Sequence, residues 1–168
     1  TAAVEETSLM EWRRCVSVNL EGAFLFSKHA APLMKSQKSG VIILTSSTAG
    51  LYGFMHRAPY VSAKWGVIGL MKTLAIELGP FNIRANAICP GGVEGPRLDG
   101  VIEREAVAKG VRTEEIREAY AAGTSMRSLV SPTDVANMAV FLASDAARLI
   151  SGQAIAVDGH TEHPEPKF

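Results

Sequence analysis

The segment GVIILTSS, Gly40 to Ser47, constrains the fold of this chain more than any other stretch. It is a short, continuous run of aliphatic residues, most of them β-branched, with polar residues on both sides. Such a run is typical of a strand that is covered on both faces, as strands are inside a parallel sheet. We therefore expect a sheet with helices packed on both sides.

Helical and extended patterns alternate along the rest of the chain. Ser8 and Glu11 have the spacing of a capping box, which predicts a helix from there to about Met34. Further along the chain we expect a helix over about 59–78, a strand in NIRANAICPGG, a helix over about 131–143 and a strand in QAIAVDG. This order predicts one α/β domain over residues 1–168, built on a doubly wound parallel sheet.

The first two expected helices are apolar nearly all round. From Val16 onward the first carries Val18, Leu20, Phe24 and Phe26 at positions that do not share one face. A helix that is apolar on all sides is normally buried on more than one side. We therefore expect both helices to be covered on two sides.

Residues 94–130 differ in composition from the rest of the chain. Seven acidic and six basic residues alternate around two short helical patterns that break near Gly110. This composition predicts a solvent-exposed, mobile insertion whose residues are not deeply buried. Because it follows a strand that should border the site, we expect it to act as a substrate lid.

Composition narrows the class of partner. The chain has 17 Lys plus Arg and 17 Asp plus Glu, so it lacks the net positive charge that would attract nucleic acid or an anionic membrane. None of its apolar runs reaches the ~18 to 20 residues of a membrane span. Cys15 and Cys89 are too far apart for a CxxC site, so we expect two structural cysteines, no metal site and a cytoplasmic protein. A small molecule is the expected partner.

Tyr60 and Lys64 are four residues apart, so on a helix they share a face. A free tyrosine titrates at about pH 10, and an adjacent ammonium group stabilises its phenolate form, which suits acid/base chemistry. The alternative is a tyrosine at the rim of the core beside an extended lysine side chain. The context favours chemistry, because Ser47 and the segment 90–92 follow neighbouring strands, and ligands bind beyond the carboxyl ends of parallel strands.

Five motifs together resemble one known family. They are VNLEGAF at 18–24, ILTSSTAG at 43–50, YVSAK at 60–64, IRANAICPGGV at 83–93 and SGQAIAVDG at 151–159. In this order and spacing they resemble the classical short-chain dehydrogenase/reductases over nearly the whole chain. The resemblance implies a Rossmann-like fold and an NAD- or NADP-dependent oxidoreductase that acts on a small alcohol or carbonyl compound.

The resemblance also implies roles for individual residues. Tyr60 would be the general acid/base, Lys64 would stabilise its phenolate and bind the nicotinamide ribose, and Ser47 would hold the substrate oxygen. Asn19 would bend its helix and hold a water that links Lys64 to solvent. The residues expected along the nicotinamide, in addition to Tyr60 and Lys64, are Pro90, Gly91 and Val93.

Two departures from the family pattern stand out. Gly95 occupies a position where many relatives have a threonine that contacts the cofactor. The glycine-rich phosphate loop and the acidic residue that selects NAD are absent, and the match begins just after that region. We therefore expect the C-terminal part of a Rossmann-like domain, without its first βαβ units, and a chain incomplete for cofactor binding.

Two further expectations concern assembly and substrate. The two apolar helices could associate across a two-fold axis, which predicts a homodimer or homotetramer, and the alternative function is a non-catalytic oligomerisation module. His56, Arg57, Arg97 and Arg104 could supply positive charge on the substrate side. Arg57 or Arg97 would then anchor an acidic substrate, whereas solvated surface arginines are the simpler interpretation.

Overall fold

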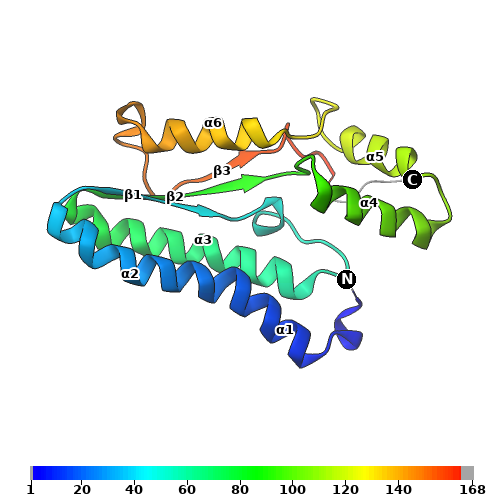
Figure 1. The fold of residues 1–168 in the computed structure, drawn as a ribbon, viewed down its shortest axis with the longest axis horizontal. Coiled ribbons are helices and arrows are strands. Elements are labelled where there is room, and N and C mark those ends of the chain that lie inside the picture. The colour runs from blue at the N-terminus through cyan, green and yellow to red at the C-terminus, as the bar shows by residue number, and fades with distance from the viewer. Residues whose placement is uncertain (1, 164–168) are drawn as a thin grey trace.

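The structure is a computed structural model that describes residues 2–163, and these form three layers (Figure 1). The middle layer is a parallel sheet in the order β1-β2-β3, made of β1 (Gly40–Thr45), β2 (Ile83–Pro90) and β3 (Ala154–Val157). One face is covered by α2 (Gly22–Gln37) and α3 (Ala58–Leu78), and the other by α6 (Pro132–Ala143). The predicted Rossmann-like α/β class is confirmed.

The two longer strands bury side chains on both faces, as the aliphatic run predicted. Ile42 and Leu44 of β1 pack in the core cluster on the α3 side, whereas Ile43 packs on the α6 side. Gly40 pairs with Ile83, and the register continues to the carboxyl end of β1. Parallel pairing in this register brings the carboxyl ends of the strands to one edge of the molecule.

The expected first helix is divided in two. α1 (Leu9–Val16) begins at the predicted capping box of Ser8 and Glu11 and continues through a π-helical turn (Ser17–Glu21) into α2. A π turn inserts one extra residue into the helical ladder and changes the direction in which the following side chains point. Sequence periodicity predicted one helix because a single extra residue barely disturbs it.

The expectation that these helices are covered on two sides fails for part of their surface in the described chain. Phe26 is 83% exposed, Val18 is 70% exposed and Ile76 is 78% exposed. One face of α2 and α3 meets the sheet, as Figure 1 shows, and α1 and the π turn pack on α3, but these exposed side chains lie outside both contacts. The apolar outer surface of α2 and α3 therefore needs another explanation.

Residues 94–130 form two helices with a small core of their own. α4 (Pro96–Lys109) and α5 (Thr113–Ala122) pack against each other beyond the carboxyl ends of the strands (Figure 1). Ile102 and Ile116 are fully buried between them, so the expectation of no deep burial is wrong. Glu103, Arg104, Glu114 and Glu118 are exposed, whereas Arg117 of α5 pairs with Asp99 of α4 across the contact.

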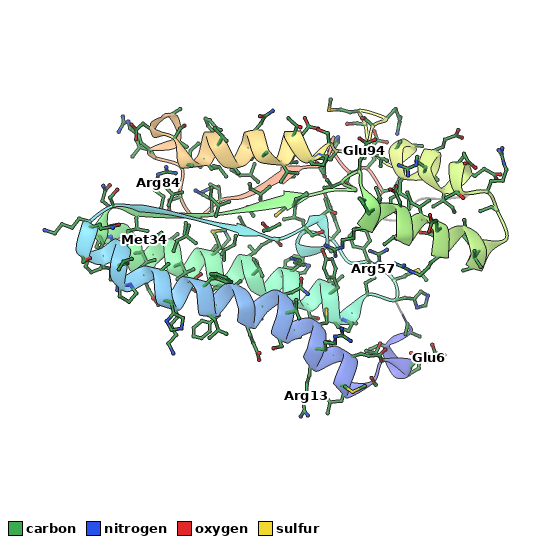
Figure 2. All side chains as sticks on the ribbon, viewed as in Figure 1. Glu6, Arg13, Met34, Arg57, Arg84 and Glu94 are labelled. Atoms are coloured by element: carbon green, nitrogen blue, oxygen red, sulfur yellow. The ribbon has the colours of Figure 1, made fainter. Side chains whose placement is uncertain are left out.

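One arginine side chain joins the sheet to the end of α6. Arg84 of β2 (Figure 2) donates hydrogen bonds to the carbonyls of Leu142, 2.7 Å, and Ser144, 3.2 Å, and so fixes the end of α6 to the sheet.

Burial raises the pKa of the Cys89 thiol, and Cys15 is half-buried, which agrees with two structural cysteines. The 3-10 turns are Val4–Glu6, Thr48–Gly50, Gly79–Phe81 and Asp145–Ala147.

Candidate active site

A cavity of about 550 Å³ lies beyond the carboxyl ends of the strands. Its volume is in the range of sites that bind small molecules. Six of the seven residues that the sequence placed in the site line it, namely Ser47, Tyr60, Lys64, Pro90, Gly91 and Val93. Asn19 is not among the lining residues.

Tyr60 and Lys64 lie on the first turns of α3 and face the cavity. The Lys64 ammonium lies 5.5 Å from the centre of the Tyr60 ring and donates a hydrogen bond to the Thr45 carbonyl, 3.0 Å away. Burial is the main cause that lowers the pKa of Lys64; interaction with Tyr60 opposes this effect and the nearby Arg97 adds to it. The buried ammonium is thus held beside the phenol by a contact to the end of β1.

Ser46 and Ser47 separate into two roles at the end of β1. The buried Ser46 hydroxyl donates to the Lys64 carbonyl, 2.9 Å, and so ties the strand to α3. Gly50 lies against this contact, because a Cβ there would be 2.4 Å from the Ser46 hydroxyl oxygen and 2.9 Å from the Lys64 carbonyl oxygen. The Ser47 hydroxyl accepts from the Ala49 amide, 3.1 Å, which leaves its proton for a ligand in the cavity.

Asn19 lies in the π turn that joins α1 and α2. Its side-chain amide donates to the carbonyl of Cys15, 3.0 Å away in the last turn of α1. The turn packs closely on α3, because a Cβ at Gly66 would be 2.7 Å from a methyl group of Leu20. The backbone therefore has the expected irregularity at Asn19, and the water link to Lys64 stays a prediction.

The segment after β2 forms another part of the cavity lining. The Gly91 amide donates to the Val157 carbonyl, 3.0 Å, and the Gly92 carbonyl accepts from the Val130 amide, 2.9 Å. A Cβ at Gly91 would lie 2.9 Å from that of Asp158, so a side chain does not fit there. Backbone rather than side chains therefore faces the cavity at this glycine pair.

Sequence reasoning missed the contact between Tyr120 of α5 and the start of α3. The Tyr120 hydroxyl donates to the Glu105 carboxylate, 3.0 Å, and also interacts with Arg57, which Figure 2 labels at the start of α3. Burial, followed by the nearby Glu105 charge, raises the pKa of Tyr120 to about 12. Tyr120 lies in a highly charged stretch, and its spacing gives no signal for this contact.

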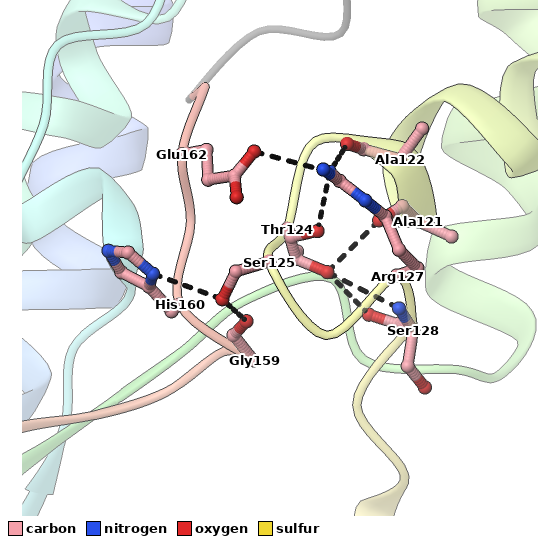
Figure 3. A network of polar contacts seen from close by, with 9 residues as sticks. All are labelled: Ala121, Ala122, Thr124, Ser125, Arg127, Ser128, Gly159, His160 and Glu162. Atoms are coloured by element: carbon pink, nitrogen blue, oxygen red, sulfur yellow. Dashed lines mark hydrogen bonds and ion pairs between the residues drawn. The ribbon is translucent and has the colours of Figure 1, made fainter.

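The chain after β3 also reaches the cavity. Figure 3 shows it docked on the turn after α5, where the His160 ring meets the Ser125 hydroxyl at 3.0 Å and Glu162 pairs with Arg127 at 3.2 Å. The Glu162 amide donates to the Gly123 carbonyl, 2.9 Å. Thr161 of this segment consequently lines the cavity. Residues 164–168 lie outside the described residues.

Of the four residues expected to supply positive charge on the substrate side, two line the cavity. Arg57 and Arg97 line the cavity, whereas His56 and Arg104 are not among its lining residues.

In the part of the chain that the structure describes, no three His, Cys, Asp or Glu side chains come together as a metal site. Within residues 2–163 no helix is long and apolar enough to cross a membrane.

The layered parallel sheet with its site at the strand ends defines a Rossmann-like α/β protein. Residues 1–160 match the family model described as enoyl-(acyl carrier protein) reductase. The chain is 40% identical over 157 residues to the trans-4-hydroxycyclohexanecarboxylate dehydrogenase of Sinomonas cyclohexanicum, an alignment that covers 94% of this chain and 54% of that protein. The chain belongs to the short-chain dehydrogenase/reductase family.

Solved structures agree with this assignment. The sorbitol-6-phosphate 2-dehydrogenase SrlD from Erwinia amylovora superposes with a TM-score of 0.90 at 30% identity, over 94% of this chain and 62% of that one. A 3-oxoacyl-[acyl-carrier protein] reductase from Brucella melitensis with bound NAD gives a TM-score of 0.81 at 32% identity, over 96% and 56%. The chain thus spans between half and two thirds of the length of these relatives.

Proposed function

We propose that this chain carries the catalytic part of an enzyme that transfers a hydride between NAD or NADP and a small alcohol or carbonyl compound. The observation that carries the proposal is that Ser47, Tyr60 and Lys64 line the same cavity. The dehydrogenases matched above are named for a hydroxy acid and a sugar-alcohol phosphate, and the reductase for a 3-oxoacyl group. These names share a carbon that bears a hydroxyl or an oxo group.

The residues of the site supply the proton chemistry. In the oxidation direction the substrate hydroxyl proton moves to the Tyr60 oxygen, and in reduction Tyr60 returns a proton to the carbonyl oxygen. The Lys64 ammonium stabilises the phenolate that forms, and its buried contact to Thr45 keeps it in place. Ser47 donates a hydrogen bond to the substrate oxygen and so holds the reacting carbon in position.

The residues present fit the nicotinamide half of the cofactor. When bound, the nicotinamide ring accepts or supplies the hydride that leaves or reaches the substrate carbon. Lys64 and Tyr60 would contact the ribose, and the backbone of Pro90, Gly91 and Val93 would lie along the ring. The side-chain-free wall at Gly91 supports this placement, because a flat ring needs close approach to the backbone.

Substitution of Tyr60 in the full-length protein tests the proposal. Tyr60→Phe should reduce turnover at least about tenfold, or ~1.4 kcal/mol of barrier, while NADH and NADPH bind nearly as before. Lys64→Ala should weaken both turnover and binding. Tyr52→Phe is the matched control, because Tyr52 is outside the cavity lining. If Tyr60→Phe keeps more than about a tenth of the activity, the role assigned to Tyr60 is wrong.

The alternative function, a non-catalytic oligomerisation module, is supported by the apolar outer surface of α2 and α3. Phe26, Leu33 and Ile76 of this surface are each more than 60% exposed. Pairing of this surface across a two-fold axis would bury it, so we infer a homodimer or homotetramer in either case. A module would show this assembly by sedimentation without binding NADH or NADPH, whereas an enzyme would do both. A cytoplasmic location stays a prediction.

A further inference from the structure

The cavity has an excess of positive charge that the chain as a whole lacks. Lysine plus arginine and aspartate plus glutamate balance at 17 each over the full sequence. Among the described residues that line the cavity, Arg57, Lys64 and Arg97 are cationic, and Glu94 is the only aspartate or glutamate. The excess is therefore a local property of the site.

We propose that the substrate is a small hydroxy or oxo carboxylic acid, and that the Arg97 guanidinium binds its carboxylate. This inference rests on the proposed function, because it names the substrate class of the same site. Arg97 lies at the second position of α4, beside the cavity, and its guanidinium carbon is 5.8 Å from the centre of the Tyr60 ring.

Arg97 differs from Arg57, the other arginine that lines the cavity, and from the arginines of the α4–α5 pair in what it contacts. Arg117 of α5 pairs with Asp99, and Arg112 pairs with Glu115 at 2.7 Å. Arg57 interacts with the Tyr120 hydroxyl. Within residues 2–163 no carboxylate forms an ion pair with Arg97. Its planar fork of N–H donors is thus available for a carboxylate ligand, with which arginine forms paired hydrogen bonds.

The neighbourhood of Arg97 favours an anion over a neutral group. Arg97 acts together with burial to lower the pKa of Lys64, so the two cationic groups are close enough to repel each other. A carboxylate bound beside Arg97 would offset this repulsion, whereas an amide would not. Binding an acid is then favoured twice, by its contact with Arg97 and by relief of the repulsion with Lys64.

The distances suit a single small molecule. A carboxylate carbon held by paired hydrogen bonds lies about 4 Å from the guanidinium carbon. From there the Tyr60 hydroxyl, which sits on the ring 5.8 Å from Arg97, is within the reach of a few carbon atoms. The hydrocarbon part would contact Phe54, Leu98 and Val101, which also line the cavity.

The test compares acids with their neutral amides in the full-length protein. We would measure kcat/KM for 2-, 3- and 4-hydroxypentanoate and for the matching hydroxypentanamides. Arg97→Ala should lower kcat/KM for the preferred acid about 10- to 100-fold and change the amides less than about threefold, since bonds to charged groups are the stronger ones. Arg97→Lys should give an intermediate loss for the acid, because it keeps the charge without the fork.

Arg104→Ala is the matched control, because Arg104 lies on the same helix and is not among the cavity-lining residues. It should leave the acid preference unchanged. Equal losses for acid and amide in Arg97→Ala, or no preference for acids in the wild-type protein, would overturn the proposal. If neutral alcohols are oxidised while acids gain nothing, only the anchor fails and the proposed function stands.

A binding measurement decides the case in which no hydroxypentanoate is oxidised. Calorimetric titration of pentanoate and pentanamide into the protein saturated with NADH reports on the anchor without turnover. Pentanoate should bind more tightly than pentanamide, and Arg97→Ala should weaken pentanoate binding at least about tenfold. Equal binding of the two probes, or pentanoate binding unaffected by Arg97→Ala, would also overturn the proposal.

Discussion

Gly50 lies where the end of β1 meets the catalytic helix, and a methyl group added there should disturb both stability and activity. A Cβ at Gly50 would lie 2.4 Å from the Ser46 hydroxyl oxygen, 2.9 Å from the Lys64 carbonyl oxygen and 3.1 Å from a methyl group of Ile68. The Lys64 carbonyl belongs to the backbone of α3, so this contact cannot be relieved by rotating a side chain. The start of α3 must instead move away from β1.

The magnitude follows from two opposing effects. An extra methyl group in a packed core costs about 1–3 kcal/mol of unfolding free energy. Replacing glycine by alanine also restricts the unfolded chain, which offsets about 0.4–1 kcal/mol of this cost. We therefore expect Gly50→Ala to destabilise the protein by about 1–2 kcal/mol. Because Lys64 would shift relative to Ser47, kcat should fall about tenfold or more.

A second substitution identifies the contact responsible. Ser46→Ala alone should cost about 0.5–1.5 kcal/mol, since it removes the hydrogen bond to the Lys64 carbonyl. The double variant Ser46→Ala/Gly50→Ala lacks the Ser46 hydroxyl, which is the nearest neighbour of the new methyl group at position 50. The combined destabilisation should therefore be smaller than the sum of the two single effects by at least about 0.5 kcal/mol.

Urea unfolding of the full-length protein, monitored by far-UV circular dichroism, measures the changes in unfolding free energy. Steady-state kinetics measures the change in kcat. Gly53→Ala is the control, because a Cβ at Gly53 would meet no atom within 4 Å. It should change stability by less than about 0.5 kcal/mol. A Gly50→Ala protein as stable as the control, or strict additivity with Ser46→Ala, would refute the argument from close contact.

Two further predictions concern α4 and α5. If these helices act as a lid, hydrogen exchange across residues 101–120 should slow when cofactor and substrate are both bound, and protection that does not change would contradict a lid. The pKa of Tyr120 is raised to about 12 in the folded state, so the unfolded state loses this proton first and stability should fall as the pH rises from about 10 to about 12. Tyr120→Phe should remove that part of the fall in chemical unfolding measured at each pH, and an unchanged profile would show that Tyr120 does not contribute.

The sequence by itself determined the features that depend on neighbouring residues. The run at Gly40 to Thr45 is a buried strand because its aliphatic residues fit a sheet covered on both faces. Ser8 and Ser131 mark helix starts because capping involves only residues three apart. The approach of Tyr60 to Lys64 is likewise a property of helical spacing, which any turn of α3 would reproduce.

The tertiary structure alone decided which residues meet across long stretches of chain. Tyr120 reaches Arg57 at the start of α3, and His160 meets Ser125, because the chain returns to the same edge of the sheet after α5 and again after β3. Nothing in the local spacing of these residues encodes the path that brings them together. The exposure of Phe26 was decided in the same way, since an apolar pattern records that a surface avoids water and not which element covers it.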